Sequence, residues 1–223
     1  MNHRSTVENG QNGYSNSNSN SNSTNSSTVL DIYPLSCYYF GSKDALPLRN
    51  ETVTDRVLRM KANYDAYGMR TCVAAVIVVE LFKHPHLLVL QINNSIYKLP
   101  GGRARFGESD IDCLKRKLLS KLCVGEENRG PEWEIGECLG MWWRSDFETL
   151  LYPYLPPNIK RPKECSKLFL IKLPASRRFI VPKNFKLLAV PLCQVHDNEK
   201  TYGPVISGVP QLLSKFSFNI VEP

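Results

Sequence analysis

The 223-residue sequence lacks the features of a secreted, membrane or zinc-binding protein. Its N-terminus has no apolar stretch of signal-peptide length, and no segment is long and apolar enough to span a bilayer. Seven cysteines are scattered, with no Cys-x-x-Cys spacing, and His84 and His86 have no cysteine at ligand spacing. We expect reduced thiols in the cytosol or nucleus, no metal and no membrane partner.

Apolar residues are almost absent from residues 13–27, which are nearly all Asn and Ser. Such a segment has no apolar surface to offset the entropy of ordering it, so residues 1–29 are predicted to form a disordered tail. Residues 30–223 have the size of one domain with one hydrophobic core. A net charge of +7 is compatible with nucleic acid or another anionic ligand.

The apolar periodicity predicts strands arranged around one central helix. Two helices are expected at residues 52–68 and 110–122, with buried stripes of Val53, Val57, Met60 and Tyr64 and of Ile111, Leu114, Leu118 and Leu122. The other expected elements are an extended segment at 30–41, strands at 71–80, 87–92, 96–99, 134–144, 167–173, 178–181 and 186–191, turns at 83–86 and 93–95, a polar loop at 125–131, a proline-rich excursion at 152–157 and a short helix at 209–213. This order predicts an α/β (α+β) fold, a mixed α/β/α sandwich.

The stretch from Tyr97 to residue 122 is a strand, a Gly101-Gly102 turn, a loop and a helix. It resembles the Nudix box, G-x5-E-x7-R-E-U-x-E-E-x-G-U with U apolar. Gly102, Glu108 and Arg116 fit the Gly, Glu and Arg of that pattern, as Leu118 and Val124 fit its apolar positions. The remaining positions carry Lys117, Ser120, Lys121 and Cys123 in place of Glu, Glu, Glu and Gly.

Those replacements are chemically specific. Nudix hydrolysis needs a divalent cation, and Mg²⁺ requires several oxygen ligands, including carboxylates. At contact distance even a screened ammonium group repels a divalent ion by more than about 1 kcal/mol, so Lys117 and Lys121 disfavour metal binding. We therefore predict a degenerate box with no catalytic residue, no metal and no cofactor.

A wider resemblance covers roughly residues 30–219. The chain resembles the small Nudix subunit of cleavage factor I, a eukaryotic pre-mRNA 3′-end processing factor, in the blocks GMRTCVAAVIVVE, YKLPGGR, CLGMWWRSDFE, YPYLPPNIKRPKE, KLFLIKL, FIVPKNFKLLAVPL and YGPVISGVPQLLSKFSF. The resemblance implies a single Nudix-like domain at 30–223 with family-specific N- and C-terminal extensions and without hydrolase activity. It also implies a nuclear homodimer that binds single-stranded UGUA-type RNA upstream of the poly(A) site, influences poly(A) site choice, and assembles with a larger RNA-recognition-motif subunit and other 3′-processing factors.

The resemblance also assigns RNA-contacting positions. They fall on Arg56, Ile96, Tyr97, Leu99, Tyr202 and Gly203. Ile96 stands where the family has a stacking Phe, and Leu48, with Glu51 nearby, stands where it has an acidic base contact. Because stacking is worth about 1–3 kcal/mol per base, the Ile96 replacement predicts weaker RNA binding than the family norm, or reliance on a partner for RNA contact.

The residues alone leave two other functions open. An active hydrolase of dinucleoside polyphosphates or capped nucleotides is opposed by the helix lysines, and a pure protein-interaction subunit is favoured by Ile96 and Leu48. Trp133, Trp142 and Trp143 are expected in the core or at a subunit interface. Basic residues of the second half form either solvated faces or a phosphate-tracking surface: Lys160, Arg161, Lys163, Lys167, Arg177, Arg178, Lys183 and Lys186.

Overall fold

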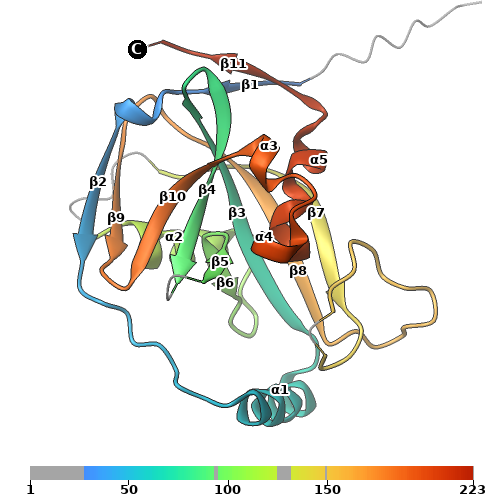
Figure 1. Ribbon diagram of the computed structural model, residues 1–223. Coiled ribbons are helices and arrows are strands. Elements are labelled where there is room, and N and C mark those ends of the chain that lie inside the picture. The colour runs from blue at the N-terminus through green and yellow to red at the C-terminus, as the bar shows by residue number, and fades with distance from the viewer. Residues whose placement is uncertain (1–27, 93–94, 125–131, 149, 223) are drawn as a thin grey trace, which may run out of the picture.

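A computed structural model describes residues 28–92, 95–124, 132–148 and 150–222 (Figure 1). Its elements in chain order are β1 (Thr28–Ile32), η1 (Leu35–Cys37), β2 (Tyr38–Lys43), α1 (Val53–Tyr67), β3 (Arg70–Leu81), β4 (His84–Ile92), β5 (Ile96–Lys98), β6 (Gly101–Arg103), α2 (Asp110–Leu122), β7 (Glu134–Arg144), β8 (Glu164–Lys172), β9 (Arg177–Pro182), β10 (Phe185–Pro191), α3 (Leu192–Val195), α4 (Glu199–Ser207), α5 (Val209–Leu213) and β11 (Phe216–Ile220).

The central sheet is mixed and has the order β10-β4-β3-β8-β7. β3 and β8 are parallel, whereas β4 lies antiparallel to both β3 and β10, and β7 lies antiparallel to β8. β3 changes partner along its length: Val78–Leu81 pair with β4, and Cys72–Ala74 pair with β6. The short strand β5 pairs antiparallel with the end of β4. The glycine turn therefore lies against the first half of β3.

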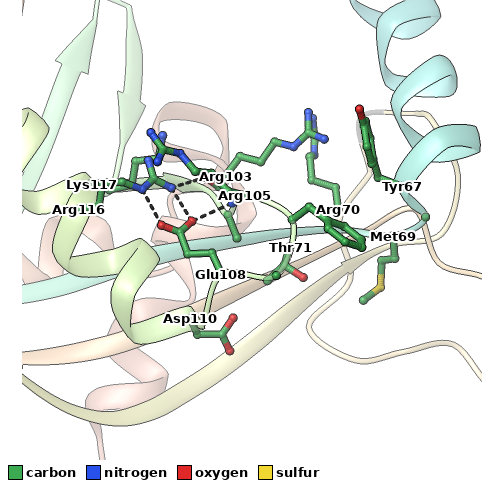
Figure 2. A pocket seen from close by; sticks show the side chains of 14 residues that line it. Tyr67, Met69, Arg70, Thr71, Arg103, Arg105, Glu108, Asp110, Arg116 and Lys117 are labelled. Atoms are coloured by element: carbon green, nitrogen blue, oxygen red, sulfur yellow. Dashed lines mark hydrogen bonds and ion pairs between the residues drawn. The ribbon is translucent and has the colours of Figure 1, made fainter.

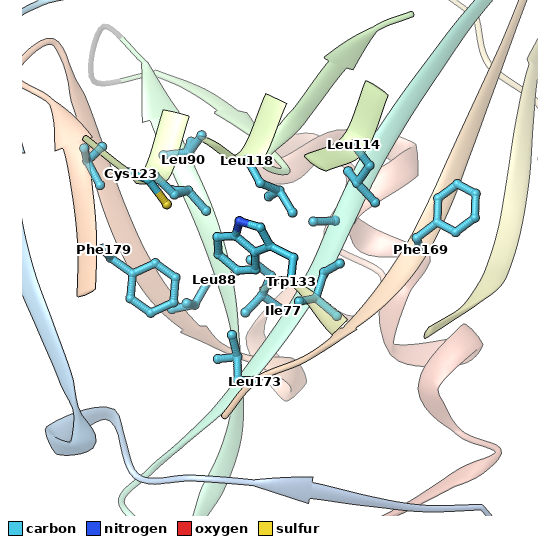
Figure 3. Close-up of a cluster of buried hydrophobic side chains, with 14 of the residues drawn as sticks. Ile77, Leu88, Leu90, Leu114, Leu118, Cys123, Trp133, Phe169, Leu173 and Phe179 are labelled. Atoms are coloured by element: carbon cyan, nitrogen blue, oxygen red, sulfur yellow. The ribbon is translucent and has the colours of Figure 1, made fainter. Parts of the chain in front are cut away.

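Helices cover both faces of this sheet, which confirms the predicted α/β/α sandwich. On one face, Leu114, Leu118 and Leu122 of α2 pack fully buried against β3, β4 and Trp133 (Figure 3). Burying each such side chain stabilises the fold by about 1.5–3 kcal/mol. On the other face, α4 and α5 pack against β3, β4 and β8 through residues such as Ile206 and Leu213. Trp142 is buried on this second face.

Two predicted buried stripes need correction. In α2, Ile111 is exposed and Cys113 is buried instead, because the helix turns its Cys113–Leu114 side toward the sheet. In α1, only Met60 is buried, and Val53 is 77% exposed. The limits of α1 are nevertheless as predicted, since Thr52 forms a capping box with Asp55.

The β3–β4 hairpin was predicted correctly, but its turn was placed two residues too late. Phe82 and Lys83 form the turn with positive φ of 53° and 63°, the geometry of a tight hairpin connection. The segment His84–His86 belongs to β4, and the His86 side chain is buried. Pattern reading also missed β6, α3, α4 and β11, which are short or interrupted by glycine and proline.

The N-terminal described segment lies at sheet edges, as expected for an extended surface segment. β1 pairs in parallel with β11, and β2 pairs in parallel with β9. Thr28 and Val29, assigned above to the tail, therefore belong to β1. The tail prediction for residues 1–27, the polar loop at 125–131 and the turn residues 93–94 lie outside the described residues.

Candidate nucleic-acid interface

The glycine turn sets the position of everything around it. Gly101 lies so close to β3 that a Cβ atom there would be 2.1 Å from the Val73 carbonyl oxygen and 2.6 Å from the Ala74 Cα. Ala75 donates its backbone N–H to the Pro100 carbonyl across 2.7 Å. No side chain fits at Gly101, so the sequence needs glycine there to bring β6 and the loop before α2 against the sheet.

The retained acidic residue of the box is engaged by the retained arginine (Figure 2). Arg116 donates from Nε to Glu108 Oε1 and from Nη2 to Glu108 Oε2, both across 2.6 Å. The Arg105 backbone N–H adds a third bond at 2.8 Å. The hydrogen bonds from Arg116 are the main reason that the pKa of Glu108 falls to about 2. Glu108 is thus an ionised carboxylate with its oxygens already occupied.

The lysines of α2 lie beside the glycine turn. The Lys117 stem covers Gly102, where an added Cβ would be 2.9 Å from Lys117 Cε. Burial, and then the charges of Lys98 and Lys117, lower the pKa of Lys121 to about 8. Among the described residues there is no group of three or more His, Cys, Asp or Glu side chains that could hold a metal ion. The donor set therefore does not fit Mg²⁺.

A cavity of about 790 Å³ opens next to these residues, between the start of β3, the loop after β6 and α2. Figure 2 shows basic side chains gathered along it. They are Arg70, Arg103, Arg105, Arg116 and Lys117. Sequence reading did not single out the first three, although two arginines alternate in Gly102-Arg-Ala-Arg-Phe106 and could have signalled a basic strand edge.

Four of the six positions assigned to RNA come together on the opposite side of β5. The rings of Tyr97 and Tyr202 lie 4.9 Å apart between centroids. Leu99 is buried in the same cluster. Gly203 follows with φ 78° and ψ 167°, a left-handed conformation that interrupts α4 and favours glycine. These four residues form the tyrosine platform.

Hydrogen bonds orient both rings of the tyrosine platform. Gln91 donates to the Tyr97 hydroxyl across 3.2 Å, and Gln194 donates to the Tyr202 hydroxyl across 3.1 Å. Burial, and then Tyr97, raise the pKa of Tyr202. With only 7% of Tyr202 exposed, its ring has no free face on which a base could stack. A base could contact only the hydroxyl edge of Tyr202 and the neighbouring backbone of Gly203.

Ile96 and Arg56 lie apart from the tyrosine platform. Ile96 is 47% exposed, and strand alternation places it with Lys98 on the face of β5 opposite Tyr97. Arg56 is exposed on α1, and Figure 1 shows α1 well separated from β5 and α4. The structure therefore does not bring Arg56 and Tyr202 together. Arg56 instead lines a depression of about 590 Å³ beside Phe147.

Leu48, at the position where the resemblance implies an acidic base contact, and the nearby Glu51 both precede α1. Leu48 is exposed, in the segment that leads into α1. The Glu51 carboxylate accepts two hydrogen bonds from Arg59, at 2.9 and 2.6 Å, and these bonds lower its pKa. Glu51 is therefore already paired within the chain.

The basic residues of the second half do not form one surface. Arg177 is buried, with its guanidinium 3.4 Å from the Trp133 ring centroid, so it is a core residue and not a surface cation. Lys167 pairs with Asp110 at 2.5 Å, and Lys163 lies 4.1 Å from the Tyr64 ring centroid. The other members are Lys160, Arg161, Arg178, Lys183 and Lys186, and all five are exposed.

Comparison with known proteins supports the resemblance. A Nudix family model, NUDIX_2, described as a nucleotide hydrolase, matches residues 28–216. Pre-mRNA cleavage factor Im 25 kDa subunit 1 of Arabidopsis thaliana is 67% identical over 194 residues, 87% of each chain. Subunit 2 of that plant is 51% identical over 196 residues, 88% of this chain and 98% of the relative. Cleavage and polyadenylation specificity factor subunit 5 of Dictyostelium discoideum is 40% identical over 194 residues, 86% of this chain and 96% of the relative.

The family model spans both layers of helices, the central sheet and the glycine turn, so the match does not depend on a short motif. The predicted fold and the predicted family are both confirmed. The chain belongs to the family of Nudix-fold 25 kDa subunits of pre-mRNA cleavage factor Im.

Proposed function

We propose that this chain is a non-catalytic RNA-binding and scaffold subunit of the machinery that cleaves and polyadenylates pre-mRNA. In this proposal it recognises single-stranded UGUA-type RNA upstream of the poly(A) site and influences which site is used. It works in the nucleus as a homodimer, together with a larger subunit that carries an RNA-recognition motif and with other 3′-processing factors. The names of its relatives, which are cleavage factor and polyadenylation factor subunits, support this role.

The observation that carries RNA recognition is the tyrosine platform. Tyr97, Leu99, Tyr202 and Gly203 are separated by up to about a hundred residues in the chain, yet they meet at one place. Hydroxyl groups and a glycine backbone at a surface can form hydrogen bonds with the edges of unstacked bases, which is how single-stranded RNA is read. The hydroxyls are held in place by Gln91 and Gln194, so the site is ordered before RNA arrives.

Two observations support the absence of hydrolysis. Glu108 is held by Arg116, and the positions of the paired glutamates carry Ser120 and Lys121. Incubation of the purified chain with Mg²⁺ or Mn²⁺ and a dinucleoside tetraphosphate or a capped nucleotide should release no product. Metal-dependent product release that is lost in Glu108→Gln would establish the hydrolase instead.

RNA recognition is tested by fluorescence anisotropy with a labelled UGUA oligonucleotide and a scrambled one of equal composition. We expect the chain to prefer UGUA, and Tyr202→Ala to abolish that preference. Tyr39→Ala is the matched control, because Tyr39 is an exposed tyrosine on β2 outside the tyrosine platform. A preference that survives Tyr202→Ala in a folded protein would contradict the site assignment.

A second candidate is a protein-interaction subunit that no longer reads RNA. Two observations favour it: the exposed side chain at the stacking position is Ile96, and the Tyr202 ring is buried. The two candidates separate in the same experiment, since this one predicts equal affinity for UGUA and scrambled RNA. Co-purification with the larger subunit would be expected from both.

A further inference from the structure

The cavity beside α2 has an excess of positive charge. Arg70, Arg103, Arg105, Arg116 and Lys117 line it, against the two carboxylates Glu108 and Asp110. Both carboxylates are engaged, because Glu108 pairs with Arg116 and Asp110 pairs with Lys167. Arg70 pairs with Glu164, a buried carboxylate outside the cavity lining. Within the described part of the chain, Arg103, Arg105 and Lys117 have no ion-pair partner.

Two further features of the surroundings leave this charge uncompensated. Arg144 lies 3.7 Å from the same Glu164 carboxylate that pairs with Arg70, so two guanidinium groups share one anion. The Nε atoms of both arginines are buried without a hydrogen-bond partner among the described residues. On the other side of Lys117, Lys98 and Lys121 lie near enough for their charges to interact. A concave site with one sign of charge concentrates its field and attracts counter-ions.

Aromatic side chains stand at the rim of the cavity. The Phe106 ring is 86% exposed and lies 6.2 Å from the ring of Tyr67, which is also exposed. Cationic grooves with exposed aromatic rings beside them are typical of sites that bind single-stranded nucleic acid. Exposed aromatic rings of this kind contribute nothing to the hydrophobic core, because they remain in water. The combination favours a phosphate-bearing strand over a small inorganic anion.

The cavity is within reach of the tyrosine platform. Gly102, on which the Lys117 stem lies, is five positions after Tyr97, and five steps along the chain span at most about 17 Å. β5 presents Tyr97 to α4 on one face and Lys98 toward α2 on the other. A strand a few nucleotides long can therefore contact both places.

We propose that the cavity lined by Arg103, Arg105 and Lys117 binds backbone phosphates of the RNA strand whose bases contact the tyrosine platform. The lysine that replaces a metal-binding glutamate would then contact phosphate directly. This inference rests on the proposed function for its ligand. The cavity would recognise a phosphate anion. Both an RNA backbone and a free phosphate compound carry that group, and the test below distinguishes them.

The experiment measures RNA affinity at several salt concentrations for the full chain and for Arg103→Gln/Lys117→Gln. Each phosphate contact to single-stranded nucleic acid adds about 0.7 to the slope of log K against log salt. The double variant should lower that slope by about 1.4 and weaken UGUA and scrambled RNA by similar factors, about tenfold or more at low salt. Arg103→Lys/Lys117→Arg should retain the wild-type slope.

Lys83→Gln is the matched control, because it removes one positive charge at the far end of β3, about 40 Å from the cavity. It should leave the slope unchanged. If the double variant does not fold, as judged by circular dichroism, Lys117→Gln alone should lower the slope by about 0.7. An unchanged slope in the folded variant overturns the proposal.

Titration calorimetry with inorganic pyrophosphate separates the two phosphate sources. Pyrophosphate binding that depends on Arg103 and Lys117, with an unchanged RNA slope, would assign the cavity to a free ligand and overturn the RNA assignment. If wild-type protein does not prefer UGUA but the double variant still lowers the slope, the proposed sequence recognition fails and the phosphate site stands.

Discussion

The two sides of β5 carry different side chains: a hydrogen-bonded tyrosine pair on one side and a group of lysines on the other. Toward α4, Tyr97 and Tyr202 form a mostly buried pair whose hydroxyls accept hydrogen bonds from glutamine side chains. Toward α2, Lys98, Lys117 and Lys121 place positive charges close together with no carboxylate partner among the described residues. The first side suits discrimination between bases, and the second suits attraction of any phosphate chain. In the proposed function, this short strand would therefore separate sequence reading from charge attraction.

The largest expected effect comes from Gly101→Ala, because this substitution should disturb both sides of β5. Gly101→Ala would place a methyl group 2.1 Å from the Val73 carbonyl oxygen, so β6 must move away from β3. We expect a loss of about 3 kcal/mol or more in the free energy of unfolding, at the upper end for over-packing, and loss of RNA binding. Urea denaturation followed by fluorescence measures the stability.

Gly107→Ala is the control for that substitution. Gly107 has φ +75° but no atom within 4 Å of an added Cβ, so it carries only the conformational cost of a left-handed alanine, about 1–2 kcal/mol. Equal losses in the two variants would show that the close approach at Gly101 is not what organises the site.

Lys121→Met affects the charged side alone. Burial lowers the pKa of Lys121 to about 8, below its value near 10.4 in the unfolded chain. The charged form therefore destabilises the folded state in full below pH 8, and this cost disappears as the pH rises toward 10.4. The variant should gain about 1–3 kcal/mol at pH 7, and the gain from removing the charge should shrink as the pH rises from 8 to 10. Thermal denaturation across that pH range measures it. A pH-independent gain would mean that packing and not charge is responsible.

Ile96→Phe tests whether the position that lost its aromatic residue limits RNA affinity. The side chain is exposed beside Lys98, so a phenyl ring has room to stack on a base. Stacking worth about 1–3 kcal/mol predicts binding about 5- to 150-fold tighter, measured by anisotropy with UGUA and scrambled RNA. Ile96→Leu should change little, and equal affinity of the Phe and Leu variants would remove the position from the interface.

Tyr202→Phe should have the smallest effect. The ring contact with Tyr97 is kept, and only the hydrogen bond that Gln194 donates across 3.1 Å is lost. We expect the free energy of unfolding to fall by about 0.5–1.5 kcal/mol. A much larger loss in calorimetry would show that the hydroxyl holds α3 and α4 together, which would make it a packing group and not a reading group.

The sequence predictions that the structure confirms depend on local chemistry. The limits of the helix expected at residues 52–68 and the apolar runs of β3 and β4 each depend on residues that are neighbours in the chain. The predictions that failed concern direction and distance. Periodicity placed Ile111 in the buried stripe of α2 and Val53 in that of α1, but which side faces the sheet depends on packing partners far along the chain. Arg177 looked like a surface cation because nothing local shows that it stacks on Trp133.

The broken Nudix box, the family blocks and the order of elements could be identified from residue identity and spacing alone. Tertiary packing, in contrast, brings Glu108 to Arg116 and Tyr202 to Tyr97, and it keeps α1, which carries Arg56, away from α4. Pairing across the sheet and packing of the helices bring together residues distant in sequence, and the energy of each contact depends on burial that no local pattern specifies. The unpaired charge of Arg103, Arg105 and Lys117 follows in the same way, since it depends on where each neighbouring carboxylate is already bound.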